Sequence, residues 1–477
     1  MGLDRLDFAI IALYLAGITL FGLRFRKRHR SLRDYFLADR NIPWWAIALS
    51  VVAAETSTLT IISIPGLAYD TNFTFLQVVF GYLTGRIVIS FILLPQYFRG
   101  DLYTAYELIE RRFGNKLRSL TAGLFLATRA AAEGVRVYAV SIVVAIALGT
   151  GQIASIAIIT ALTLIYTFEG GLAAVIWTDV VQTVIYVGGT LVGMLTILHL
   201  VPGGWHAVHA VAAGAGKFQL FDFAPNLWKP YTFWAGIIGG TFFTLASHGT
   251  DQLIVQRLLA ARSQRQSAVA LISSGVAVIF QFALFLLVGV MLFAYYGRPS
   301  ASFGRADRIY PTFIVSHMPH GISGLLIAAI LAAAMSNLSA ALNSLSSSAM
   351  LDFYLRRHPQ MDEQKKMRLS RLSTLCWALL LFVLALIALH KAGRVVEVGL
   401  QIASVAYGAL LGAFLLGVLT RKANQRGAML GMLCGFAVEL VLWQRTSVPW
   451  TWWVFIGAAI TFVVGYAASL FGQREHA

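Results

Sequence analysis

The chain is poor in charged residues and in cysteine. Only 12% of its 477 residues are Asp, Glu, Lys or Arg, roughly half the share found in ordinary soluble domains. Its two cysteines, Cys376 and Cys434, lie in apolar runs and do not form a metal-ligand spacing. The phosphate-binding pattern GxxxxGK[ST] does not occur. These absences argue against a soluble enzyme and against an ATP-driven pump.

Long apolar runs are what the sequence has instead. Hydrophobic residues make up 58% of the chain. Each run is long enough for a helix to cross roughly 30 Å of hydrocarbon. The sequence therefore predicts an all-α polytopic membrane protein in the lipid bilayer, with about 13 transmembrane helices. The predicted spans cover residues 7–24, 44–67, 75–97, 119–148, 152–168, 175–200, 233–250, 267–296, 322–350, 370–390, 397–419, 427–444 and 449–471.

The net charge of +16 is explained by membrane topology better than by a nucleic-acid partner. With an external N-terminus and 13 spans, 25 of the 37 Lys and Arg residues fall in inner loops and the C-terminal tail, and nine fall in outer segments. This asymmetry follows the positive-inside rule. We predict an external N-terminus, a cytoplasmic C-terminus, a bacterial inner (plasma) membrane location and no nucleic-acid partner.

Two predicted spans carry helix-breaking residues at mid-depth. Pro65 and Gly66 are expected to end the span 44–67, and Gly239-Gly240, followed by SHGTD at 247–251, to break the span 233–250. Secondary transporters place their binding sites at discontinuous helices in corresponding positions of two repeats. The two interrupted spans lie five spans apart, which suggests two five-helix halves with the first span outside the repeat.

The stretch VVAAETSTLTIISIPG at 51–66 places a carboxylate and several hydroxyls inside a span. An ionisable residue at this depth indicates a functional site. On a continuous helix, Ala53, Thr56 and Thr60 share one face, and Glu55 and Ser57 point about 100° to either side. Oxygen ligands of this kind suit Na⁺. Helix packing, with each hydroxyl bonded to its own backbone, is the alternative.

Three further polar groups lie inside predicted spans. The ninth span is dense in Ser and Asn over 331–350, more than helix packing requires. Asp179 lies about one turn into the sixth span, as a functional carboxylate or as an interface residue that reaches the headgroups. Arg129, Glu133 and Arg136 form one stripe on one helix, which is either an internal ion-pair ladder or a clamp for a substrate carboxylate.

These stretches together resemble the sodium:solute symporters, the family of the proline, sodium/glucose and sialic-acid transporters. The resemblance implies the leucine-transporter fold, with ten core helices in two inverted five-helix repeats. It divides a single transporter domain, 1–477, into an extra helix and inner basic loop at 1–40, the core at 41–420 and two peripheral helices at 421–477. The matching motifs are YFLADRNIPWW, AAETST, GGLAAVIWTDVVQ, TDQLIVQRLLA, AAAMSNLSAALNS and LLGVLTRKANQRGA.

The resemblance also implies a sodium site between the first and eighth core helices. The family uses two carbonyls of the broken first helix, and one carbonyl and two hydroxyls of the eighth. Asn337 stands where a hydroxyl is usual, and its side-chain carbonyl can replace that ligand. The matching positions here are Ala53, Thr56, Ala333, Ser336 and Asn337.

A second cation or coupling site is implied by three more positions. Some members hold a second sodium with the Asp of the TD motif and hydroxyls of the eighth core helix. Asp179 and Ser339 match, but Ala340 replaces one hydroxyl. Glu55 falls where the proline-transporter branch carries an important Asp, which identifies it as a sodium- or substrate-coupling carboxylate.

The resemblance places the substrate at the same break. In the sialic-acid branch, hydroxyls of the first core helix and an Arg of the third contact the substrate carboxylate; Ser57, Thr60 and Arg129 match them. Further pocket residues are predicted on the second, sixth and tenth core helices. These are Phe75, Gln77, His248 and Tyr407.

The predicted function is Na⁺-coupled symport of a small polar solute by alternating access, in a monomer or weak oligomer. The arginine stripe and the hydroxyls favour a carboxylate substrate: an amino acid, a sugar acid such as sialic acid, or a monocarboxylate. The alternative is an H⁺-coupled symporter with Glu55 as proton carrier. A sensor or channel is the third reading, but neither a signalling domain nor regular gating charges are found in the sequence.

Overall fold

The computed structural model describes residues 2–26, 41–99, 105–166, 172–354, 361–390 and 393–474, and these form a bundle of helices. Apolar runs fold this way because a lipid-exposed backbone must satisfy its hydrogen bonds within the segment. The main helices are α1 (Arg5–Arg26), α3 (Trp44–Glu55), α4 (Thr58–Asp70), α5 (Leu76–Ile92), α6 (Leu94–Phe98), α7 (Ala105–Phe113), α8 (Asn115–Leu148), α9 (Gln152–Tyr166), α10 (Leu172–Leu200), α11 (Gly204–Gly214), α12 (Gly240–Gly249), α13 (Gln252–Leu259), α14 (Gln264–Tyr296), α15 (Ile309–His317), α16 (Ile322–Ser348), α18 (Glu363–Leu389), α19 (Val395–Leu419), α20 (Gln425–Arg445) and α21 (Trp450–Arg474).

Each of the 13 predicted spans coincides with a helix or a broken helix. Among the described residues, nine helices are long and apolar enough to cross a membrane, and the bent pair α3–α4 makes ten. The all-α polytopic class is therefore confirmed. The crossings assigned to α1, to α9 and to the segment ending in α12 stay predictions, and the inner basic loop lies outside the described residues.

The first predicted break was placed at the wrong residues. Pro65 lies inside α4, which continues to Asp70. The chain breaks instead at Thr56 and Ser57, where α3 and α4 meet at a bend of 65°. Ser57 is extended, with φ −77° and ψ 172°. Pro65 is the eighth residue of α4, a position where a proline removes one intrahelical hydrogen bond. Membrane-spanning helices tolerate such prolines because neighbouring helices and side chains satisfy the freed backbone group. The break also separates Thr60 from the helical face predicted for Ala53 and Thr56.

The second predicted break was also partly wrong. Gly239 and Gly240 have helical dihedral angles and join a π-helical turn, Ala235–Gly239, to α12. Their function is close packing: a Cβ on Gly240 would lie 2.3 Å from the carbonyl oxygen of Val78 on α5. The helix ends at Gly249, and Asp251 caps the next helix by accepting a bond from Leu253 N at 2.9 Å. The discontinuity therefore lies in the SHGTD motif alone.

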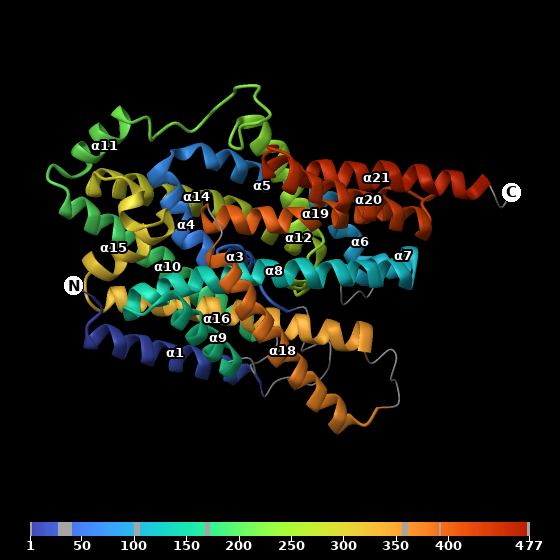
Figure 1. The fold of residues 1–477 in the computed structure, drawn as a ribbon, viewed down its shortest axis with the longest axis horizontal. Helices are drawn as coiled ribbons and strands as arrows, with labels where there is room; N and C mark the ends of the chain where they lie inside the picture. Colours follow the sequence, from blue (N-terminus) through green and yellow to red (C-terminus); the bar gives the residue numbers. More distant parts are fainter. Residues whose placement is uncertain are drawn as a thin grey trace.

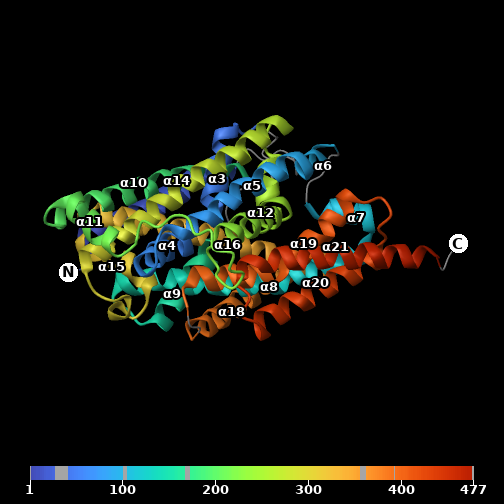
Figure 2. The same ribbon diagram turned by 90° about the horizontal axis from the view of Figure 1, so that it is seen from above.

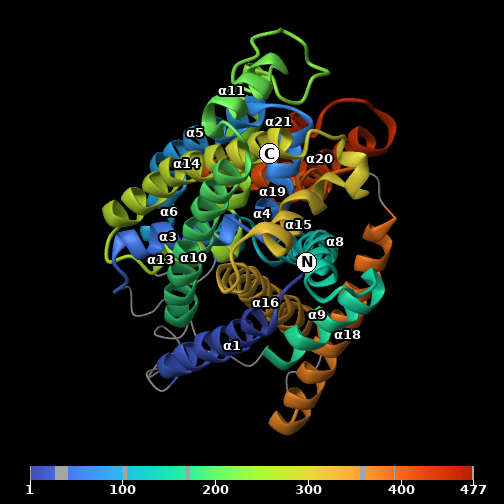
Figure 3. The same cartoon turned by 90° about the vertical axis from the view of Figure 1, so that its left-hand side faces the viewer.

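The long helices run along one axis, with α1 beginning at one end of the molecule and α21 ending at the other (Figure 1). Seen from above, α3, α5, α10 and α14 gather on one side, and α8, α18, α20 and α21 on the other (Figure 2). In the end-on view, α4 lies in the middle of the bundle and α1 and α18 at its edge (Figure 3). The break between α3 and α4 is thus surrounded by other helices.

The helix α1 is fastened to α16 by one buried carboxylate. Asp7 accepts hydrogen bonds from Gly321 N at 2.7 Å, Gly324 N at 3.0 Å and Ser323 Oγ at 2.8 Å. These donors belong to the first turn of α16 and its approach, where backbone N–H groups lack intrahelical partners. Nδ1 of His320 lies 2.9 Å from the same carboxylate. Asp7 therefore caps α16 and docks the extra helix on it.

Candidate functional site

The break in the second span frees the two carbonyl groups predicted to bind sodium. Ser57 N donates to Glu55 O at 3.0 Å instead of to Ala53 O, the helical partner. Thr60 N donates to Ser57 O at 2.9 Å instead of to Thr56 O. The carbonyls of Ala53 and Thr56 are therefore without their helical donors. Unwound carbonyls of this kind are how broken transporter helices coordinate Na⁺.

The other three predicted sodium ligands lie on α16, which contacts α4, the second half of the broken span. Ala333 belongs to a regular helix and is buried, whereas Ser336 and Asn337 are half-buried. Ser339 is buried as well. Within the described part of the chain, the side chains of these three polar residues make no hydrogen bonds to the protein. Their oxygens are therefore available to a ligand.

Glu55, the last residue of α3, is an ion-pair partner of Arg86 on α5. The Arg86 side chain is fully buried, and its Nη2 also lies 3.1 Å from Nε2 of His248 on α12. His248 Nε2 is 3.6 Å from the Glu55 carboxylate, and its Nδ1 lies 2.8 Å from Ser247 Oγ. Glu55, Arg86 and His248, which we call the break triad, thus connect three helices at the break.

Asp179 is buried rather than at the membrane interface. Its Oδ2 accepts a hydrogen bond from Ser50 Oγ at 2.6 Å and lies 3.1 Å from Arg257 Nη2. Arg257 Nε donates to Ser50 Oγ at 2.9 Å. Arg257, which the charge count placed in an inner loop, is therefore an internal residue of α13. This cluster joins α3, α10 and α13, and Ser339 is not among its hydrogen-bond partners.

The arginine stripe on α8 forms the internal ladder. Arg129 Nε lies 2.9 Å from Glu133 Oε1, and Arg136 pairs with the same carboxylate. Arg129 Nη1 is also 3.5 Å from Asp251 Oδ2, to which Tyr407 OH donates at 3.5 Å. Arg129 and Tyr407 therefore meet at the start of α13. The guanidinium of Arg129 faces two carboxylates without any substrate.

Phe75 and Gln77 lie at the start of α5. The Phe75 ring is buried and stacks on Phe282, with centroids 5.8 Å apart. Gln77 Nε2 donates to the carbonyls of Thr74 and Tyr231, both at 3.1 Å. Its Oε1 accepts a hydrogen bond from Asp222 N at 3.0 Å, within the connecting segment 215–234. The amide of Gln77 therefore holds this segment in place, and its assignment to the substrate stays a prediction.

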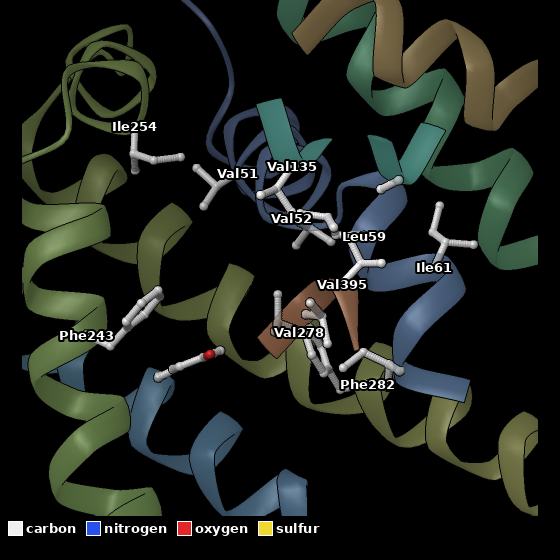
Figure 4. Packing of buried hydrophobic residues seen from close by; sticks show 14 of the residues in the cluster. Val51, Val52, Leu59, Ile61, Val135, Phe243, Ile254, Val278, Phe282 and Val395 are labelled. Atoms are coloured by element: carbon white, nitrogen blue, oxygen red, sulfur yellow. The ribbon is translucent and has the colours of Figure 1, made fainter. Parts of the chain in front are cut away.

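Apolar side chains enclose the break. Val51, Val52 and Leu59 from its two halves point toward side chains of α8, α12, α14 and α19 (Figure 4). The nearby hydroxyls have different partners: Thr56 Oγ1 donates to Gln281 Oε1 at 2.8 Å, and Thr60 Oγ1 to Glu55 O at 3.3 Å. Ser57 is half-buried between the two half-helices. Charges within such an apolar enclosure, such as those of Glu55 and Arg86, interact more strongly than they would in water.

Several partners at the site were not predicted from the sequence. Arg86 carries a visible signal, because it is an arginine inside an apolar run, but nothing local to it indicates Glu55 as its partner. Gln281 and Ser50 have no such signal. Asp251 lies within the TDQLIVQRLLA motif, and the motif as a whole gave no reason to single out this carboxylate as a partner of Arg129.

A helical membrane protein with a broken span, freed carbonyls and buried ion pairs has the architecture of a secondary transporter. Residues 35–435 match the Sodium:solute symporter family. The sodium/sialic acid symporter NanT of Aliivibrio fischeri is 29% identical over 97% of this chain and 92% of its own. The sodium-coupled monocarboxylate transporter 2 of Bos taurus is 26% identical over 96% of this chain and 73% of its own.

A solved structure gives the same result for the fold. The structure of the substrate-bound, outward-open state of a Na⁺-coupled sialic acid symporter superposes on this chain with a TM-score of 0.85. The two sequences are 27% identical, and the superposition covers 98% of each chain. The chain belongs to the sodium:solute symporter family. It is a Na⁺-coupled symporter and not an enzyme, as the sequence predicted.

Proposed function

We propose that the protein couples the inward movement of Na⁺ to the uptake of a small solute that carries a carboxylate. Na⁺ binds to the carbonyls of Ala53, Thr56 and Ala333 and to the side chains of Ser336 and Asn337. The main support is the pair of carbonyls freed at the break. On α16, which contacts α4, Ser336 and Asn337 are half-buried and have no protein partner among the described residues. Na⁺ bound there connects the two helices and favours the outward-open state.

The carboxylate class is supported by the relatives, because sialic acid and monocarboxylates, the solutes in their names, both carry one. The solute binds at the break, with Ser57 and Thr60 as hydroxyl donors and Phe75, His248 and Tyr407 around it. A membrane potential of 100 mV contributes about 2.3 kcal/mol per Na⁺ to concentrating this solute.

Proton coupling through Glu55 is the alternative, and Asn337 in a hydroxyl position is the reason to test it. The pairing of Glu55 with Arg86 argues against it. Protonation of Glu55 would leave the buried guanidinium without its counter-charge, which is costly in a membrane interior.

We further propose that the protein is a monomer or weak oligomer in the inner membrane, with its N-terminus outside and its C-terminus in the cytoplasm. The beginning of α1 and the end of α21 at opposite ends of the molecule support an odd number of crossings. The core 41–420, the extra helix before it and the peripheral α20 and α21 after it form one transporter domain.

The first experiment measures thermal unfolding of the purified protein in NaCl, KCl and choline chloride at equal ionic strength, across the neutral pH range. A ligand that binds only the native state raises the midpoint. We expect a Na⁺-specific rise that is lost in Ser336→Ala. Uptake of sialic acid and pyruvate into proteoliposomes then tests the substrate class. Uptake that follows a pH gradient and ignores Na⁺ would replace sodium coupling by proton coupling.

A further inference from the structure

Arg86 is a buried cation whose hydrogen-bonding capacity is only partly used. Its side chain is fully buried, and Nη2 makes the contacts to Glu55 and His248. The other two nitrogens, Nε and Nη1, are buried and have no hydrogen-bond partner in the part of the chain that the structure describes. A buried donor without an acceptor costs about 1–3 kcal/mol, and more when it is charged. These nitrogens therefore indicate a missing acceptor.

Two more unpartnered groups lie around the break. Thr244 Oγ1, one turn before His248 on α12, and Thr58 Oγ1, at the start of α4, are buried without a partner among the described residues. Thr244 packs against α5 next to Arg86, where a Cβ on Gly85 would lie 2.8 Å from the Thr244 Cβ. Unused polar groups thus come from α4, α5 and α12, the helices that meet at the break.

The surroundings of Arg86 differ from those of Arg129. Arg129 lies between the carboxylates of Glu133 and Asp251. An added anion would be repelled by both. Among the described residues, Arg86 has the single carboxylate of Glu55 as ion-pair partner, and two of its nitrogens have no hydrogen bond. Arg129 also has one such nitrogen, Nε, but that atom lies 2.9 Å from the Glu133 carboxylate.

We propose that Arg86 is the residue that binds the carboxylate of the solute, and that Glu55 makes this binding depend on Na⁺. This inference rests on the proposed function. Without Na⁺, Glu55 and Arg86 form a neutral pair that gives a second carboxylate little net attraction. Glu55 lies between Ala53 and Thr56 in the chain, so Na⁺ on their carbonyls would add a positive charge at the backbone that carries Glu55. The site then carries one net positive charge, and the solute carboxylate neutralises it.

The test measures binding of sialic acid and pyruvate to the purified full-length protein by calorimetry, in NaCl and in KCl. For the wild type we expect binding in NaCl and at least a roughly 10-fold weaker affinity in KCl. Arg86→Gln should lower the affinity in NaCl by roughly 10- to 100-fold, because charge-assisted bonds are lost, and should keep the Na⁺-dependent rise in unfolding midpoint. Glu55→Gln should bring the affinity in KCl to within about threefold of the value in NaCl.

Arg136→Gln is the matched control, because it removes another arginine that pairs with a carboxylate inside a span. It should bind like the wild type. Arg129→Gln shows which of the two arginines binds the solute. If Arg129→Gln loses affinity for the solute in NaCl and Arg86→Gln keeps it, the proposal is overturned in favour of Arg129. If Arg86→Gln does not fold, Glu55→Gln is the deciding variant. Solute binding that still requires Na⁺ in Glu55→Gln would refute the proposed coupling.

The two levels of the hypothesis fail in different ways. If the wild type binds neither carboxylate in NaCl, the proposed substrate class is wrong and Arg86 loses its assigned role. If the wild type shows Na⁺-dependent binding and Arg86→Gln retains it unchanged, the substrate class stands and the assignment of Arg86 is wrong.

Discussion

Asp179→Ala should destabilise the protein strongly and independently of Na⁺. The carboxylate and its partner Arg257 are each 6% exposed and 3.1 Å apart. Removing Asp179 leaves Arg257 with hydrogen bonds to Ser50 Oγ and to the carbonyl of Leu253, but without a counter-charge. Breaking a buried ion pair by removing one partner costs about 3–5 kcal/mol.

The control replaces both charges. In the double variant Asp179→Leu/Arg257→Met, no buried charge is left unpaired, and apolar replacements of buried pairs are often neutral or stabilising. We expect its free energy of unfolding to lie within about 1 kcal/mol of the wild type. The comparison separates the cost of an unpaired guanidinium from the loss of any other function of Asp179.

Equilibrium unfolding in mild detergent, titrated with sodium dodecyl sulfate, measures both variants. Trp45 and Trp177 pack edge-on across α3 and α10, with centroids 5.5 Å apart, and contribute to the fluorescence of the 11 tryptophans that follows unfolding. A loss below about 1 kcal/mol in Asp179→Ala, or an equal loss in both variants, would refute the ion-pair reasoning. Loss of the Na⁺-dependent stabilisation in the double variant would instead identify Asp179 as a cation ligand.

Three smaller predictions concern contacts between helices and between α5 and the segment 215–234. The hydrogen bond with Asp7 raises the pKa of His320 above its ordinary value of about 6.5. The stabilising effect of His320 over His320→Ala, measured by unfolding midpoints, should therefore be complete at acidic pH and disappear as the pH rises through the raised pKa. Gly81→Ala should cost about 1–3 kcal/mol, because its Cβ would lie 2.3 Å from the Gly236 carbonyl oxygen, whereas Gly17→Ala, an open position, should unfold like the wild type. Gln77→Ala should speed proteolysis of the connecting segment 215–234, and an unchanged cleavage rate would show that the segment does not depend on this amide.

The sequence by itself determined the class and the position of nearly every helix. Apolar runs of sufficient length have one stable form in a bilayer, so hydropathy alone predicts α8, α14 and α16. The hydroxyls and the carboxylate of AAETST indicated that the second span carries a functional site, because polar groups at that depth are costly unless they are used.

Tertiary structure decided where that span breaks and what its charges contact. Pro65 predicted the wrong position, because a membrane-spanning helix packed among others tolerates an internal proline. The extended backbone at Ser57 depends on the helices around it. The partners of Glu55 and Asp179 lie 31 and 78 residues away in the chain, Arg86 and Arg257. Pairing over such separations is set by the three-dimensional packing of helices, which no local spacing in the sequence encodes.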